Sequence, residues 1–119
     1  MNARSAKAKG QRAAKEVQSV LLQVFTELTN DDIRVTPVGV NGPDIQLSSK
    51  GKEVIPLAIE IKNQEKLNVW EALKQAEGHV EERETPVLVF KRNRSKTYAA
   101  LELNRFLEIL ENGRLGKAR

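Results

Sequence analysis

The sequence predicts a single α/β or α+β domain built on a mixed β-sheet. The chain has 119 residues, the usual length of one domain, so we expect one domain over 1–119. Its apolar residues recur at helical spacing in some segments and at strand spacing in others. One segment reads strand–helix–strand, which pairs its strands in parallel, whereas the earlier strands are joined by short turns. The predicted order is therefore α-β-β-β-α-β-β-α.

A first helix is predicted over 11–28, and the polar segment after it ends the helix. Its apolar residues fall at helical spacing and form one stripe: Val17, Val20, Leu21, Val24 and Leu28. Residues 1–9 precede this helix and carry several basic side chains. We expect them to form a flexible N-terminal arm.

Three strands are predicted next, over 33–39, 44–47 and 54–62. Pro37 lies in the first strand and indicates an edge or a bulge, because proline has no backbone N–H to donate. The segment Ser-Ser-Lys-Gly-Lys separates the second strand from the third and predicts a hairpin turn. These strands are therefore expected to be antiparallel.

The second half of the chain predicts a crossover helix, two strands and a last helix. Asn68 is the candidate N-cap of the crossover helix, with Glu71 as its capping-box partner. That helix is expected to reach about Glu82. The remaining elements are strands over 86–91 and 97–103, a helix that Asn104 caps and Gly113 ends, and a basic tail over 113–119.

Composition excludes several classes of protein. The chain has no cysteine and one histidine, so thiolate zinc sites, disulfide frameworks and multi-histidine chemistries are not expected. Its apolar runs are shorter than the roughly 20 residues that a membrane-spanning helix needs. No charged-then-apolar leader opens the sequence, so we expect a cytoplasmic protein.

Positive charge is concentrated at the two ends of the chain and in the segment Lys-Arg-Asn-Arg-Ser-Lys. The net charge is +4, which is compatible with a polyanionic partner. Any one of these clusters can be a solvated tail or turn, but three of them favour a surface that contacts phosphates. The candidate DNA-binding residues are Lys9, Arg12, Lys15, Arg92, Arg94 and Lys96.

Three residues around the third predicted strand form the candidate active site. Side chains alternate along a strand, so Glu60 and Lys62 lie on the same face. A hairpin in simple register brings Asp44 near the end of that strand. An exposed Glu-x-Lys pair is common on protein surfaces and contributes little to stability. This strand, however, is otherwise apolar and is expected to be covered on both faces, where a buried ion pair is unusual. Two carboxylates bind Mg²⁺ through oxygen, and a neighbouring lysine can stabilise an anionic transition state.

The order Gly42-Pro43-Asp44, hairpin, Glu60-Ile61-Lys62 resembles the signature of the PD-(D/E)xK nuclease superfamily. The small size and the basic first helix are most similar to the archaeal-type and phage-type Holliday junction resolvases. The resemblance implies a restriction-endonuclease-like core and a Mg²⁺ or Mn²⁺ cofactor. The metal ligands that it implies are Glu16, Asp44, Glu60 and the Ile61 carbonyl, with Lys62 acting on the attacking water or the transition state.

Two of these assignments have alternatives. Glu16 falls on the flank of the first helix and can instead form an i, i+4 pair with Arg12. Gln75 lies off the inner stripe of the crossover helix, on a flank shared with His79. Some lineages of the superfamily use a glutamine there near the metal or the DNA, but a solvated glutamine fits the sequence equally well. His79 has no evident acidic partner.

The function expected from this resemblance is cleavage of branched DNA at a four-way junction by a homodimer that makes two symmetric cuts. A nickase or another nuclease with a different substrate is the first alternative. The second is a DNA-binding module without catalysis. The third is an unrelated basic α/β domain in which the acidic residues and the lysine coincide by chance.

Overall fold

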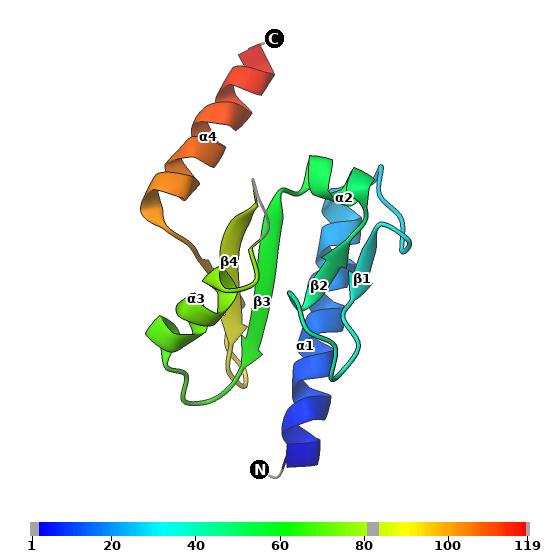
Figure 1. Cartoon of the computed structure of the whole chain (residues 1–119), viewed down its shortest axis with the longest axis vertical. Helices are drawn as coiled ribbons and strands as arrows, with labels where there is room; N and C mark the ends of the chain where they lie inside the picture. The colour runs from blue at the N-terminus through cyan, green and yellow to red at the C-terminus, as the bar shows by residue number, and fades with distance from the viewer. Residues whose placement is uncertain (1–2, 81–83, 119) are drawn as a thin grey trace.

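The computed structural model of the chain describes residues 3–80 and 84–118, and it has an α/β architecture with a mixed sheet (Figure 1). The elements, in order, are α1 (Ala3–Val24), β1 (Ile33–Val35), β2 (Ile45–Leu47), α2 (Ser49–Val54), β3 (Leu57–Asn63), α3 (Val69–Glu77), β4 (Thr85–Lys91), β5 (Tyr98–Ala100) and α4 (Leu103–Ala118). The expected α/β class with a mixed sheet is confirmed, and the described residues form one helix more than the sequence predicted.

Strand β3 is an edge strand of the three-stranded sheet, whose order is β3-β4-β5. It pairs in parallel with β4, which pairs antiparallel with β5, whereas β1 and β2 form a separate antiparallel pair. Ile59 and Ile61 pack into the core that α1 covers, and the alternate residues Ala58 and Glu60 are buried on the face that α3 covers. The predicted crossover is therefore confirmed, and β3 is covered on both faces, as expected.

The hairpin turn predicted between the second and third strands is wrong, because residues 49–54 form the short helix α2. The Ser48 hydroxyl caps this helix by accepting a hydrogen bond from the Gly51 N–H at 3.0 Å. The Asp32 carboxylate in turn accepts from the Ser48 hydroxyl at 2.7 Å. A polar network from the preceding loop thus holds the turn residues in a helix.

Helix α1 begins earlier and ends earlier than expected. It starts at Ala3, so residues 3–9 are helical where a flexible arm was predicted. Only part of the predicted stripe packs on the core: Val17 and Leu21 contact it, whereas Val20 and Val24 are 55% and 64% exposed. Ala13 and Ala14, which the prediction left out, are buried. Alanine side chains let a helix approach the sheet closely, which places them inside in preference to the valines.

The crossover helix begins where the sequence predicts. The Asn68 side chain accepts a hydrogen bond from the Glu71 N–H at 3.1 Å and caps α3. The helix ends at Glu77, five residues before the predicted end, and Gly78 caps it. Residues 81–83, which include part of the predicted extension, lie outside the described residues.

The last helix is longer than predicted and extends away from the sheet (Figure 1). Helix α4 begins at Leu103, so the predicted cap Asn104 lies inside its first turn. Gly113 does not end it, since α4 continues through the first six residues of the predicted basic tail to Ala118. In the part of the chain that the structure describes, no helix is long and apolar enough to cross a membrane.

Gly51 is predicted to tolerate no side chain. A Cβ atom there would lie 2.8 Å from the Asp32 carbonyl oxygen and 3.3 Å from the Leu47 Cβ, so the backbone would have to shift. We expect Gly51→Ala to lower the free energy of unfolding by about 1–3 kcal/mol, the usual cost of overpacking. Chemical denaturation checks this. Gly113→Ala is the matched control, because its Cβ would meet nothing within 4 Å; equal stability of the two variants would contradict the account.

The Asp32 network predicts a specific pH dependence of stability. Hydrogen bonds from the Thr29 N–H and then the Ser48 hydroxyl lower the pKa of Asp32 below its ordinary value of 3.8. The folded protein therefore binds this proton less tightly than the unfolded chain, so the contribution is present above about pH 4 and is lost on further acidification. The urea midpoint of the wild type should fall between about pH 6 and about pH 3. The midpoint of Asp32→Asn should fall less over the same interval. An equal fall in both proteins would rule out this role.

Candidate active site

Asp44 lies beside β3 because its backbone and its side chain both bind that strand. Its N–H donates to the Ile59 carbonyl at 2.9 Å, and its Oδ2 accepts from the Ile61 N–H at 2.6 Å. Gly42 has φ +123°, a conformation that residues with a side chain rarely adopt, and Pro43 follows it. The predicted position of Asp44 near the end of the third strand is confirmed, although no hairpin produces it.

The Ile61 carbonyl oxygen lies on the same edge of β3 as Asp44. The N–H and C=O of one residue in a strand point to the same edge, and the Ile61 N–H points to Asp44. This edge is opposite the one that pairs with β4, since Ile59 also bonds Asp44 there. The Ile61 carbonyl oxygen and the Asp44 carboxylate therefore lie along the same edge of β3.

Glu60 is a buried carboxylate, with only 4% of its surface exposed. Burial raises the pKa of Glu60 above its ordinary value, and the negative charge of Asp44 raises it further. Hydrogen bonding to His79 and the positive charge of Lys62 act in the opposite direction. Asp44 and Glu60 are thus close enough to interact electrostatically, and Lys62 belongs to the same group.

His79 is a site residue that the sequence analysis missed. Its Nδ1 lies 3.1 Å from Glu60 Oε2, so the histidine described above as lacking an acidic partner has a buried one. His79 follows Gly78, the C-cap of α3, and α3 packs on the face of β3 that carries Glu60. The only signal in the sequence was its position four residues after Gln75 on one helix flank.

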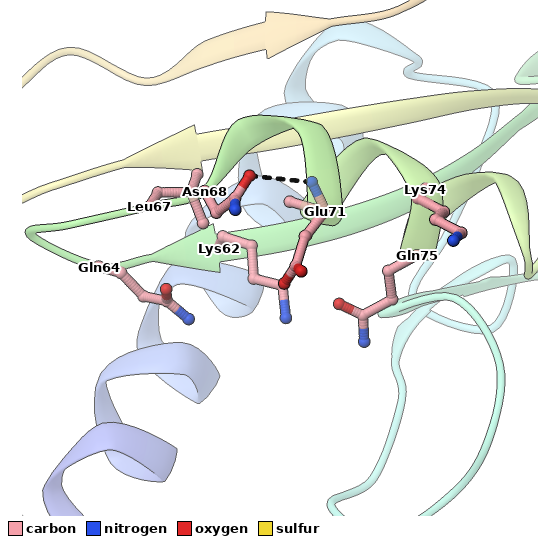
Figure 2. A pocket seen from close by; sticks show the side chains of 8 residues that line it. Lys62, Gln64, Leu67, Asn68, Glu71, Lys74 and Gln75 are labelled. Atoms are coloured by element: carbon pink, nitrogen blue, oxygen red, sulfur yellow. Dashed lines mark hydrogen bonds between the residues drawn. The ribbon is translucent and has the colours of Figure 1, made fainter.

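Lys62 and Gln75 line an open pocket of about 450 Å³ between β3 and α3. Figure 2 shows the Lys62 side chain leaving β3 on the side from which Glu71 and Gln75 leave α3. The structure therefore brings Gln75 and Lys62 to one cavity. The wall of this pocket formed by α3 begins at the N-terminal end of the helix, which Asn68 caps.

The structure does not bring Glu16 to the other two carboxylates. Glu16 Oε2 lies 3.8 Å from Lys91 Nζ, and the residue lines a groove with Ile61 and Val89 on the α1 side of the sheet. Glu60 faces α3 on the other side. Helix α1 instead contributes Lys7, Gly10, Gln11 and Ala14 to the cavity that contains Asp44.

The basic candidates differ in their surroundings. Lys9 is buried, and its Nζ lies 3.9 Å from Glu65 Oε2, so it anchors α1 to the end of β3 and does not face solvent. Arg12 and Lys15 are exposed on α1. Three more exposed candidates, Arg92, Arg94 and Lys96, lie in the turn between β4 and β5.

The turn that carries these last three basic residues has a defined backbone. Glu65 Oε2 accepts from the Asn93 N–H at 2.7 Å, and the Ser95 hydroxyl accepts from the Arg92 N–H at 3.0 Å. Arg94 has φ +62°, in the left-handed region. Glu65 therefore holds both the basic turn and the Lys9 ammonium at the carboxyl end of β3.

The residues fit a magnesium ion better than a metal that needs a complete protein cage. Within residues 3–80 and 84–118 the structure places no three acidic, histidine or cysteine side chains where they could hold one ion together. Asp44, Glu60 and the Ile61 carbonyl supply hard oxygen donors, and Mg²⁺ typically takes one or two carboxylates and completes its shell with water and phosphate. Carboxylates that bind metal are usually fixed by further hydrogen bonds, as Glu60 is by His79.

Comparison with known proteins finds no match: no family model, no curated protein and no solved structure is similar to this chain.

The pKa of Glu60 is predicted to fall when Asp44 loses its charge. Asp44→Asn keeps an oxygen that can accept from the Ile61 N–H but removes the negative charge that raises the pKa of Glu60. NMR titration of the Glu60 side-chain carboxyl carbon should therefore give a lower pKa in this variant than in the wild type. Glu16→Gln is the matched control and should leave the value unchanged. An unchanged or higher value in Asp44→Asn would show that the two carboxylates are not neighbours.

Proposed function

We propose that this protein is a Mg²⁺-dependent endonuclease with the PD-(D/E)xK arrangement of residues, and that its substrate is branched DNA such as a four-way junction. The observation that carries the proposal is the Asp44 carboxylate held against the Ile61 N–H, which places it beside the buried Glu60 on β3. Lys62 follows two residues later on the same face of that strand. A structural role alone gives little reason for this group, because burying a carboxylate on the covered face of β3 costs free energy.

Each residue has a defined part in this proposal. Asp44, Glu60 and the Ile61 carbonyl would hold the metal ion, with His79 fixing the orientation of Glu60. A Mg²⁺ ion, when bound, activates water and neutralises charge on a phosphodiester. Lys62 would orient the attacking water or stabilise the negative charge that develops on the phosphate.

The basic residues would bind the DNA backbone around this site. Arg12 and Lys15 on α1 and the turn between β4 and β5 are exposed and carry no base-reading motif, so they suit contacts to phosphates. Two symmetric cuts in a junction require two active sites, and the proposed form is therefore a homodimer. An enzyme of this kind would act in the cytoplasm.

Cleavage of a labelled four-way junction tests the proposal, beside a linear duplex of the same sequence, in Mg²⁺ and in EDTA. We expect paired nicks in the junction alone and none in EDTA. Glu60→Gln and Lys62→Met should each slow cleavage by about 10²-fold or more, the usual cost of losing a group that stabilises the transition state. Glu27→Gln is the matched control, since this exposed glutamate lies beyond α1, near Lys50 and the opposite end of β3.

The outcomes separate the alternatives. Equal cleavage of the duplex would keep the nuclease chemistry and exclude a junction-selective enzyme. Junction binding without cleavage would indicate a DNA-binding module. Cleavage that survives EDTA or Glu60→Gln would exclude the metal site described here.

A further inference from the structure

Helix α4 carries an apolar stripe that is not covered by its own chain. Leu103, Phe106, Leu107 and Leu110 recur at i, i+3, i+4 and i+7, and Ile109 flanks them. All five are between 40% and 66% exposed. Among the described residues, α4 has no extensive packing against another helix or strand, and Figure 1 shows it directed away from the sheet. An amphipathic helix in this position is stable only if something covers its stripe.

A groove of matching chemistry lies on the α1 side of the sheet. It has a volume of about 330 Å³ and is lined mainly by apolar side chains from α1, β3 and β4, among them Val17, Val20, Leu21, Ile61 and Val89. Val20 lines it while remaining 55% exposed, and Val24 one turn further along α1 is 64% exposed. Helix α1 therefore covers only part of this face of the sheet.

We propose that α4 of one copy packs into the groove between α1 and β4 of a second copy, and that the exchange is reciprocal. Each chain carries one apolar helix and one apolar groove. In a twofold-symmetric dimer, each helix would fill the groove of the other copy, so that both helices and both grooves are covered. Only residues 101–102 separate α4 from β5, and this short connection directs the helix away from its own groove (Figure 1).

The area of this contact matches what a stable dimer needs. The five apolar side chains of α4 expose about 300–400 Å², taking roughly 120–150 Å² for a large side chain. Two helices and the two grooves that they cover then bury about 1,200–1,600 Å², within the range of stable protein interfaces. The stripe on α4 alone is as large as the largest apolar patch of a typical monomer, and such patches are often functional.

This inference rests on the proposed function in one respect, since it names the interface of the homodimer proposed there. The contact itself is argued from apolar surfaces and not from nuclease chemistry. An experiment that reads association, without DNA or metal, therefore tests it separately.

Disulfide trapping distinguishes a second copy from the same chain. The protein has no cysteine, so Val20→Cys and Leu107→Cys introduce the only thiols. Oxidation of a mixture of the two single variants, carrying tags of different size, should give a covalent dimer that contains both tags. Leu103→Cys and Leu110→Cys, used in turn, cover the register of the helix in the groove. Trp70→Cys is the matched control, because Trp70 is 82% exposed on α3, across the sheet from the groove.

Sedimentation of the full chain gives the second measurement. The wild type should be a dimer, Leu107→Glu should raise the dissociation constant by about tenfold or more, and Trp70→Glu should leave it unchanged. A monomeric wild type, or a cross-link only within the Val20→Cys/Leu107→Cys double variant, would overturn the proposal. Paired nicks made by a dimer that Leu107→Glu does not weaken would overturn this interface and leave the proposed function standing. A dimer that is trapped through α4 and the groove, but does not cleave DNA after reduction, would support the interface and contradict the proposed function.

Discussion

The hydrogen bond from the Ile61 N–H to Asp44 Oδ2 is the interaction on which the rest of the site depends. With the bond from the Asp44 N–H to the Ile59 carbonyl, it joins the β1–β2 pair to the edge of β3. The same contact fixes a carboxylate beside the buried Glu60 and turns the Ile61 carbonyl toward it. Structure and candidate chemistry are therefore coupled, since a change that loosens this edge also separates the oxygen donors.

The parallel crossover and the shared face of Glu60 and Lys62 could be predicted from the sequence because both follow from local patterns. The apolar run of β3, the Asn68 cap of α3 and the next apolar run specify a parallel crossover, and side-chain alternation puts Glu60 and Lys62 on one face. Helix α2 could not be predicted in this way. Helix α2 depends on Asp32, which lies 16 residues before Ser48 and binds its hydroxyl. The composition of residues 48–52 is typical of a turn and does not indicate that contact.

The errors in the candidate site arise from tertiary contacts that the apolar pattern of the helices does not show. Large apolar residues predict the inner face of α1, but Ala13 and Ala14 are also buried there because small side chains permit close packing. Glu16 pairs with Lys91 on the α1 side of the sheet. His79, just beyond the end of α3, contacts Glu60, which is 19 residues away in the sequence. The uncovered face of α1 that results is the groove proposed to receive α4 from a second copy.

The most direct test of the central claim is to locate a bound metal ion, independently of any cleavage. Mn²⁺ added in small amounts to isotope-labelled protein broadens the amide signals of residues near the ion. The account predicts that Asp44 and Ile61 broaden first, that Glu16 and Lys91 do not, and that Asp44→Asn weakens the effect. Broadening centred on Glu16, or spread evenly over the acidic surface, would contradict a metal site at the edge of β3.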